Sequence, residues 1–381
     1  NREGNGNLVL GYDADFINNG SNGNGSTNND NVAIGRESVL GSDVNGVNGI
    51  ITVGAYSLVD KNYSISIGYD ADSYGRRSTG VGYNVDIAEG IDDVNAIGYS
   101  ATPTADGATI FGNYGSVTGN YGIALGYTSL ADSLSIALGA NASATGVNSL
   151  GLGSSSNVTG ENSLGFGSNS SVTGRNSIAI GFGATVTADN EVYIGNSSTT
   201  SIGGAVNWTA TSDGRFKTNV ENNVPGLNFI LGLTPITYNF DVAKMNKFNE
   251  TNGIATINKD NNVYSGFIAQ DVYKLAQSLD YDFSGVKVPE NKDKEMFGIR
   301  YAEFVVPLVQ ATQELNKKVD EQQKQIEAQN ELISKQQDLI EKFNSTLEAY
   351  AESVQKLQRE LNTLEVKDES EPTITASADK K

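Results

Sequence analysis

The sequence predicts three successive parts: a mainly β N-terminal half, a small α+β segment, and a long C-terminal coiled coil. Three observations lead to this division. Short strands that end in glycine recur up to Gly195, the repeat stops near residue 200, and heptads of apolar residues run from Val305 to Leu364. A chain of 381 residues is long enough for two or three such units.

Composition limits the chemistry that the chain can perform. It contains no cysteine and no histidine. These absences exclude disulfides, a thiolate nucleophile, a Ser-His-Asp triad and most transition-metal sites. Catalysis would have to use Ser, Thr, Lys, Tyr or carboxylate groups, and we expect no metal and no cofactor.

Charge and hydropathy limit the partners. The formal net charge is −19, and residues 1–200 carry six Arg or Lys against eighteen Asp or Glu. Such an acidic surface repels nucleic acid, so we expect no nucleic-acid partner. No apolar run approaches the ~20 residues that span a bilayer, so we expect no membrane insertion. The chain begins at Asn1 rather than Met and shows no signal peptide, which we interpret as a processed or partial sequence.

The N-terminal half is an internal repeat with a period of 14 residues. Residues 148–153 recur at 162–167 and 176–181, and Val158 and Val172 keep the same spacing halfway between. Each repeat therefore holds two short strands with a turn after each. The Asn/Gly/Ser-rich stretches 18–31 and 41–49 are expected to be loops. Similar strands are closed by Gly11, Gly35, Gly54, Gly68, Gly82, Gly98, Gly112, Gly126, Gly139, Gly153, Gly167, Gly181 and Gly195.

This pattern predicts a β-solenoid or β-roll whose coils stack at ~4.8 Å, so that the coils together rise about 60 Å. In Ile178, Ala179 and Ile180, alternation puts both isoleucines on one face, and we expect that face to point inward. Glycine permits the tight turns, because a positive φ costs it little. Two or three inward apolar side chains per coil are too few to stabilise a single thin rod, so the sequence predicts an oligomer. The strict spacing of Ile, Leu and Val argues against a disordered Gly/Ser/Asn tract.

Two features of the turns are candidates for ligand binding. The aspartate pairs Asp13/Asp15 and Asp70/Asp72 offer few oxygen ligands for calcium, and solvated turns are the simpler interpretation. The second feature is a set of tyrosines that follow closing glycines, either as an exposed stripe that stacks on sugars or as structural caps over the coil edges. These are Tyr12, Tyr69, Tyr83, Tyr99 and Tyr127.

The motif Asn-Ser-Ile-Ala-Ile-Gly at 14-residue spacing resembles the head repeats of trimeric autotransporter adhesins. The resemblance covers residues 7–195 and implies a left-handed trimeric β-roll. Those adhesins end in a membrane anchor, whereas this sequence ends in heptads and the polar residues 366–381. We therefore expect no anchor of the autotransporter kind.

A serine and a lysine five residues apart follow the end of the repeat. Ser212 and Lys217 lie in the motif Ser-Asp-Gly-Arg-Phe-Lys. Without histidine, a serine hydroxyl can be activated by a lysine that burial has made neutral, and its oxygen can then attack the neighbouring carbonyl. The spacing alone is weak, because such pairs occur by chance in most proteins. The structural alternative is that Ser212 caps the following turn and Lys217 is a surface lysine.

The blocks that follow make the motif more specific. Ser-Asp-x-Arg-x-Lys precedes Val-Pro-Gly-Leu at 224–227, Leu-Thr-Pro-Ile-Thr-Tyr at 233–238, Gly-Phe-Ile-Ala-Gln-Asp-Val at 266–272 and Leu-Val-Gln-Ala at 308–311. This ordered series, over residues 211–320, resembles the C-terminal intramolecular chaperone domain of phage tailspikes, endosialidases and tail fibres. The resemblance implies a domain that trimerises, assembles the fibre before it, and then cuts itself off ahead of the motif serine.

Carried to this chain, the resemblance implies cleavage of the Thr211–Ser212 bond, with Ser212 as the nucleophile and Lys217 as its general base. Asp213 and Arg215 match the motif and are expected to position the site as an ion pair. An aromatic residue replaces the aliphatic one that is commoner before the motif lysine, which should leave the Ser-Lys dyad intact. Attack on the neighbouring bond is intramolecular, so the fold has already brought the reactants together.

Local patterns between the motif and the heptads predict further elements. We expect a short helix at 229–233, strands at 235–240 and 264–268, a helix that begins at 271, and a polar loop over 244–262. Trp208, the single tryptophan, is expected to fill the junction between the stacked repeats of the N-terminal half, which we call the ladder, and this segment.

Nine heptads predict a coiled coil from Val305 to Leu364. Position a is apolar in all but one heptad, whereas Gln322, Gln329 and Gln336 occupy consecutive d positions. Polar d residues lower stability but fix the register and fit a wide core. Together with the need of the ladder for partners, they favour a parallel homotrimer.

The sequence therefore predicts a trimeric fibre or adhesin with β-roll head repeats (1–196), a neck (197–211), a self-cleaving intramolecular chaperone domain (212–303), a coiled coil (304–365) and a disordered tail (366–381). It would act as a single-turnover serine peptidase on its own chain only. We expect it outside the cell, on a phage virion or a bacterial surface, facing a host-surface receptor for which a glycan is one candidate.

Several alternatives stay open. One is a non-cleaving fibre with an inactive chaperone domain. Another is a glycan-binding or glycan-degrading tailspike, although no carboxylate pair for hydrolysis stands out. A membrane-bound transcription factor would need a basic DNA-binding unit. An ice-binding face would need more ranks of threonine than the four that recur from Thr145 to Thr187.

Overall fold

The computed structural model describes residues 6–16, 30–41, 48–196, 198–248, 262–292 and 295–368, so most of the two expected loops at 18–31 and 41–49 lies outside it. The chain divides into two compact units. The first comprises Asn1–Phe216, Thr237–Gly266 and Val288–Phe297, and the second comprises Lys217–Ile236, Phe267–Lys287 and Gly298–Lys381.

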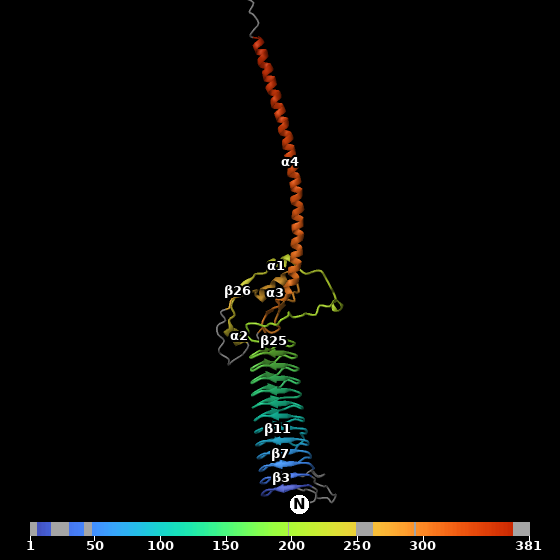
Figure 1. The fold of residues 1–381 in the computed structure, drawn as a ribbon, viewed down its shortest axis with the longest axis vertical. Helices are drawn as coiled ribbons and strands as arrows, with labels where there is room; N and C mark the ends of the chain where they lie inside the picture. The colour runs from blue at the N-terminus through green and yellow to red at the C-terminus, as the bar shows by residue number, and fades with distance from the viewer. Residues whose placement is uncertain are drawn as a thin grey trace, which may run out of the picture. The chain divides into compact units, whose positions relative to one another are not determined.

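The ladder of the first unit is a parallel β-solenoid with coils of about 14 residues, as the repeat predicts (Figure 1). In each coil a three-residue strand is followed by a turn and, in all but the last described coil, a two-residue strand. The three-residue strands form one 13-stranded sheet in chain order: β1 (Leu8–Leu10), β3 (Val32–Ile34), β5 (Ile51–Val53), β7 (Ile65–Ile67), β9 (Thr79–Val81), β11 (Asn95–Ile97), β13 (Thr109–Phe111), β15 (Ile123–Leu125), β17 (Ile136–Leu138), β19 (Leu150–Leu152), β21 (Leu164–Phe166), β23 (Ile178–Ile180) and β25 (Val192–Ile194).

The two-residue strands form two further parallel sheets. The five-stranded sheet contains β2 (Asp15–Phe16), β4 (Val39–Leu40), β6 (Leu58–Val59), β8 (Asp72–Ser73) and β10 (Asp86–Ile87). The seven-stranded sheet contains β12 (Thr102–Pro103), β14 (Ser116–Val117), β16 (Leu130–Ala131), β18 (Ser143–Ala144), β20 (Asn157–Val158), β22 (Ser171–Val172) and β24 (Thr185–Val186).

Glycine closes each coil because neighbouring coils approach too closely for a side chain. At Gly68 the backbone has a φ of +145°, and a Cβ there would overlap the carbonyl oxygen of Gly82 in the next coil. Only glycine meets both requirements, a left-handed conformation and no Cβ. The coils therefore stack in register, as in β21 and β23, where Phe166 lies beside Ile180.

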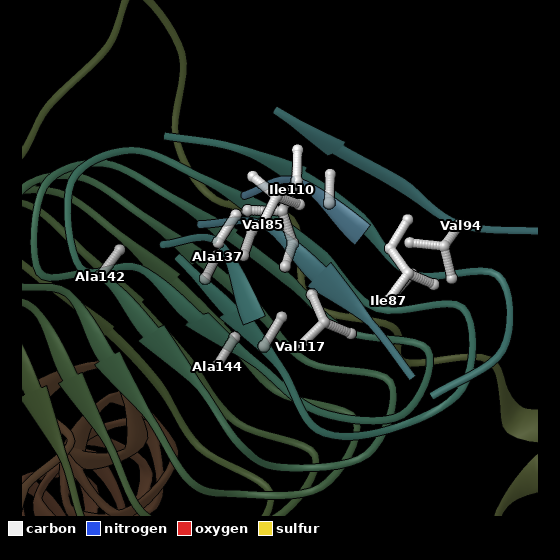
Figure 2. Close-up of a cluster of buried hydrophobic side chains, with 14 residues drawn as sticks. Val85, Ile87, Val94, Ile110, Val117, Ala137, Ala142 and Ala144 are labelled. Atoms are coloured by element: carbon white, nitrogen blue, oxygen red, sulfur yellow. The ribbon is translucent and has the colours of Figure 1, made fainter. Parts of the chain in front are cut away.

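The interior of the coils is narrow and contains mainly small side chains (Figure 2). The middle residue of most three-residue strands is small and fully buried, as at Ala96, Ala137 and Ala179. The two-residue strands contribute valines from the opposite side, such as Val117 and Val158. The core is thus a thin layer between the sheets.

Buried serines complete this layer by bonding to the next coil. The hydroxyl oxygen of Ser163 accepts the backbone N–H of Ser177 at 3.1 Å, and the hydroxyl of Ser177 accepts that of Glu191 at 3.1 Å. Such bonds satisfy backbone donors that the turns would otherwise leave buried and unpaired.

The expectation that the flanking isoleucines point inward is wrong. The first and third residues of the three-residue strands lie on the outer side of the 13-stranded sheet, where Phe166 is 48% and Ile180 is 37% exposed. Because the small middle residues and the valines already fill the interior, the larger side chains have no room inside. We call this outer side, formed by the first and third residues of β5 to β23, the apolar face.

The second unit contains two short helices and one long helix. Its elements are α1 (Leu227–Gly232), α3 (Ala269–Ser278), the antiparallel pair β28 (Val286–Lys287) and β29 (Gly298–Ile299), the 3-10 turn η2 (Tyr301–Phe304), and α4 (Val305–Asp368). Helix α1 packs against α3 and α4. The pair β26 (Ile236–Tyr238) and β27 (Tyr264–Gly266) and the helix α2 (Val242–Phe248) complete the described elements.

An aromatic cluster forms the core of the second unit. Phe229 of α1 is fully buried, and its ring lies 4.9 Å from that of Phe283 and 6.3 Å from that of Phe304. The carboxylate of Glu314 accepts the backbone N–H of Leu227 at 2.8 Å, which ties α4 to the start of α1.

The local predictions for this region have mixed outcomes. The short helix, the two strands and the helix near residue 271 are confirmed by α1, β26, β27 and α3. The polar loop expected over 244–262 is wrong at its start, where α2 lies, and its residues 249–261 lie outside the described chain. Trp208 is 85% exposed, so the expectation that it fills a junction is wrong.

Helix α4 carries all nine predicted heptads without interruption (Figure 1). Its apolar a and d side chains, such as Ile326, Ile333 and Leu357, are exposed in the single chain. The helix ends at Asp368, beyond the expected boundary at 365, and residues 369–381 lie outside the described chain. Among the described helices, none has the length and apolar character that crossing a membrane requires.

Candidate functional sites

The predicted cleavage site lies in an exposed segment between the last coil and α1. Thr211 and Ser212 are both exposed and belong to no helix or strand. The 3-10 turn η1 (Gly214–Phe216) follows, and the backbone N–H of Phe216 donates to the carbonyl oxygen of Asp213 at 3.2 Å. The Thr211–Ser212 bond thus lies just before a defined turn on an accessible stretch of chain.

Asp213 and Arg215 form a bidentate ion pair across this turn. The guanidinium donates from Nε to Oδ1 at 3.2 Å and from Nη2 to Oδ2 at 2.6 Å, and the backbone N–H of Arg215 also donates to Oδ1 at 2.9 Å. These bonds lower the pKa of the Asp213 carboxyl, first through the side chain and then through the backbone of Arg215. The pair holds the turn next to Ser212 in one geometry.

Lys217 follows the turn directly and is exposed, as is Phe216 before it. The division between the two units falls between these two residues. The motif therefore spans the boundary of the ladder unit and the unit that contains α4.

Two of the sequence blocks downstream line a common cavity in the second unit. The cavity has a volume of about 160 Å³ and is bordered by Leu233 and Ile236 from one block and by Phe267, Asp271 and Val272 from the other. The blocks are therefore neighbours in space as well as ordered in the sequence.

A second candidate site is a column of six tyrosines on one turn of the ladder, whose neighbouring rings contact one another. We call it the tyrosine column: Tyr56, Tyr69, Tyr83, Tyr99, Tyr114 and Tyr127. Neighbouring ring centroids lie 5.0 to 5.8 Å apart, and the rings of Tyr69, Tyr83 and Tyr99 are nearly parallel, with interplanar angles of 6° and 4°. At the N-terminal end, the guanidinium of Arg36 lies 5.0 Å above the ring of Tyr56 and donates to its hydroxyl.

Sequence reasoning found four of these six residues. It missed Tyr56 and Tyr114, which stand two residues after the closing glycine instead of one. Allowing that offset would have revealed one tyrosine per coil from Gly54 to Gly126. Tyr12, the fifth tyrosine of the predicted set, is 73% exposed and is not among the stacked rings.

Two protein-family models match the chain, one in the ladder and one in the segment that follows the predicted cleavage site. Residues 212–281 match the family "Chaperone of endosialidase", and four overlapping segments within 133–190 match the "YadA head domain repeat (2 copies)". The resemblance inferred from the motifs is thereby confirmed.

Among solved structures, the chain is similar to the collagen-binding domain of the Yersinia adhesin YadA. The two are 24% identical, the match covers 42% of this chain and 79% of that one, and the TM-score is 0.32. No curated protein matches the chain.

Proposed function

We propose that three copies of this chain form a parallel fibre, and that the C-terminal chaperone domain assembles the fibre and then releases itself by cleaving the Thr211–Ser212 bond. The observation that carries the assembly is the apolar face. Columns of mainly Ile, Leu, Val and Phe, interrupted by Thr79, Asn95 and Thr109, run along one side of a 13-stranded sheet and are at least partly exposed in the single chain. A water-soluble protein rarely leaves so long an apolar surface uncovered.

The long helix supports the same assembly. Helix α4 has 64 residues, which corresponds to about 96 Å, and its apolar seam is exposed along the whole length. An isolated amphipathic helix is stabilised mainly by packing its apolar side against a partner. A parallel trimer would cover the seam of α4 and the apolar face of the ladder with the same symmetry.

The cleavage proposal rests on the motif and its setting. The family match begins at residue 212, and Ser212, Asp213, Arg215 and Lys217 all fit the motif pattern. The scissile bond is exposed, and the Asp213–Arg215 ion pair fixes the turn behind the serine.

The chemistry follows from these residues. Neutral Lys217 takes the proton from the Ser212 hydroxyl, and the oxygen bonds to the carbonyl carbon of Thr211. The peptide C–N bond breaks as the nitrogen of Ser212 takes the proton back from Lys217, which leaves an ester between Thr211 and the serine oxygen. Water then hydrolyses the ester, giving a carboxylate on Thr211 and restoring the Ser212 hydroxyl.

Assembly would control this reaction through burial. Lys217 is exposed in the single chain. Desolvation favours the neutral amine. If neighbouring copies cover Lys217 in the trimer, cleavage follows assembly and does not precede it.

The test is expression of the whole chain followed by a denaturing gel and intact-mass measurement. The wild type should give two fragments that separate between Thr211 and Ser212. Ser212→Ala and Lys217→Arg should each leave one band while sedimenting as trimers, because the first removes the nucleophile and the second keeps the charge but cannot lose its proton. Ser201→Ala, an exposed serine in the same segment, is the matched control and should be cut normally.

Two results would contradict the proposal in different ways. An uncut wild-type trimer would leave a fibre with an inactive chaperone domain. A coiled-coil variant such as Ile326→Asp with Ile333→Asp that is monomeric but cut at the wild-type rate would refute the coupling to assembly. In the proposed role the fibre is displayed on a virion or cell surface, where it contacts a host-surface receptor.

A further inference from the structure

The tyrosine column is not needed to build the ladder. In the three coils that follow Tyr127, the same turn position holds Ala140, Ser154 and Ser168. The closing glycines there keep φ values of +133° to +142°, and backbone bonds such as Ser155 N–H to Ala140 O at 2.8 Å match Asn84 N–H to Tyr69 O at 3.0 Å. The turn therefore forms equally well with a methyl or hydroxymethyl group at this position.

The column is also a large exposed surface. The side chains from Tyr69 to Tyr127 are 41% to 55% exposed. At roughly 200 Å² per aromatic side chain, these five half-exposed rings present about 500 Å², toward the upper end of what a monomer exposes in one patch. Five coil steps of ~4.8 Å make the column about 24 Å long. A surface of this size that the fold does not require needs a different explanation.

The geometry of the rings determines what they can contact. The nearly parallel rings from Tyr69 to Tyr99 partly cover each other's faces, yet each of these residues is still 41% to 47% exposed. Partial desolvation raises the pKa of Tyr114, and the neighbouring Tyr99 adds to the shift. The column thus offers apolar ring edges with a hydroxyl group at every coil.

Small polar side chains accompany the column. The residue after each of four tyrosines carries a carboxylate, an amide or a hydroxyl group: Asp70, Asn84, Ser100 and Thr128. All four have a positive φ and lie on the same turns. Hydroxyl-rich ligands bind where apolar surface alternates with such hydrogen-bonding groups.

We infer that the tyrosine column binds a neutral, extended polysaccharide that runs along the fibre axis and makes one set of contacts per coil. The inference rests on the proposed surface-fibre function and names the receptor class and its site. The acidic ladder repels polyanions, which excludes anionic glycans and nucleic acid. The residues beside the tyrosines are small and polar, which suits a hydroxyl-rich ligand that hydrogen-bonds between the rings.

The test is electrophoresis of the intact fibre in native gels that contain dextran, a soluble β-glucan or heparin. We expect at least one neutral polysaccharide to slow the wild type and heparin to leave it unaffected. Tyr83→Ser with Tyr99→Ser should weaken the apparent affinity on the order of tenfold or more. The control is Tyr63→Ser with Tyr121→Ser, two tyrosines on another turn of the coil that are more exposed than Tyr83 and Tyr99, and it should bind normally.

A second variant guards against misfolding. Tyr83→Phe with Tyr99→Phe keeps the stacked rings and removes two hydroxyl groups, so it should stay trimeric and still bind more weakly than the wild type. The inference is overturned if this variant binds like the wild type, if the control pair loses binding equally, or if heparin slows the fibre as much as the neutral polysaccharides do. It is also overturned if the serine pair fails to trimerise, since the column would then lie between subunits. A cleaved trimer that no neutral polysaccharide slows would overturn the inference and leave the proposed function standing.

Discussion

Phe166→Ser measures how much the apolar face contributes to assembly. Phe166 is 48% exposed in the single chain, so covering it in a trimer removes roughly 100 Å² of apolar surface from water. At about 25 cal/mol per Å² this is about 2.5 kcal/mol per chain, and about 7 kcal/mol for three chains. Such a loss corresponds to a weakening of the trimer on the order of 10⁵-fold in its dissociation constant.

The matched control is Phe182→Ser. Phe182 is 50% exposed, nearly the same as Phe166, but it follows the closing Gly181 and lies on the turn, outside the apolar face. Its replacement should change stability by no more than about 0.5 kcal/mol. The two substitutions therefore differ in position and not in chemistry.

The assay is thermal unfolding of the ladder, followed by the β-sheet signal in circular dichroism at several protein concentrations. Sedimentation should show trimers of both variants at high concentration. The ladder of the Phe166→Ser protein should melt earlier and with a steeper dependence on concentration than the Phe182→Ser protein. Equal melting of the two variants would refute the argument that the apolar face is a subunit interface.

Two further predictions concern the ladder itself. Gly68→Ala should destabilise the ladder by more than about 1 kcal/mol, because the new Cβ overlaps the carbonyl of Gly82 and the φ is positive. The comparison variant in thermal melts is Gly90→Ala, where a Cβ meets nothing within 4 Å. Asp72→Asn should stabilise the ladder at neutral pH and remove part of its pH dependence. Burial, and then Asp70 and Asp86, raise the pKa of Asp72 from 3.8 to about 6, so the folded state binds the proton more tightly and wild-type stability falls as pH rises through this window. The full pKa shift corresponds to about 3 kcal/mol, which screening of this partly exposed group reduces to about 1 kcal/mol. If the stabilities of wild type and variant differ by the same amount at pH 3 and pH 7, the assignment is contradicted.

The period of the ladder was predictable from the sequence, but the direction of its side chains was not. Alternation shows that Ile178 and Ile180 share a face and that Ala179 lies on the other. It does not show which face is inside. That depends on the width of the coil, which is set by the opposing strand and leaves room for an alanine against a valine such as Val172 but not for two isoleucines. Which side chains are buried therefore depends on the whole coil and on its partners.

For the cleavage motif, too, one part was predictable from the sequence and another was not. Its position, and the candidates Ser212 and Lys217, follow from ordered sequence blocks. Their exposure depends on how many chains surround them, which no single sequence segment encodes. The helix α2 was missed because its segment is polar, although Val242, Met245 and Phe248 recur every third residue, which is a helical spacing.

The proposed trimer gives the C-terminal part a specific task, which is to align the three ladders. A repeat with nearly identical coils does not fix the relative height of three chains: a shift by one coil still places all but one of the thirteen strands opposite a similar strand. The coiled coil lacks this ambiguity, because Gln322, Gln329 and Gln336 form a polar block within a mostly apolar seam, and a chain shifted by one heptad would place Gln against Leu or Phe. Helices also form faster than sheets whose contacts are distant in sequence. The aligned coiled coil can therefore set the height of the ladders before they associate, and once their apolar faces are covered the chaperone is no longer needed to hold them. This sequence of events requires a release point between the ladder and the C-terminal part, and the Thr211–Ser212 bond lies there in the chain.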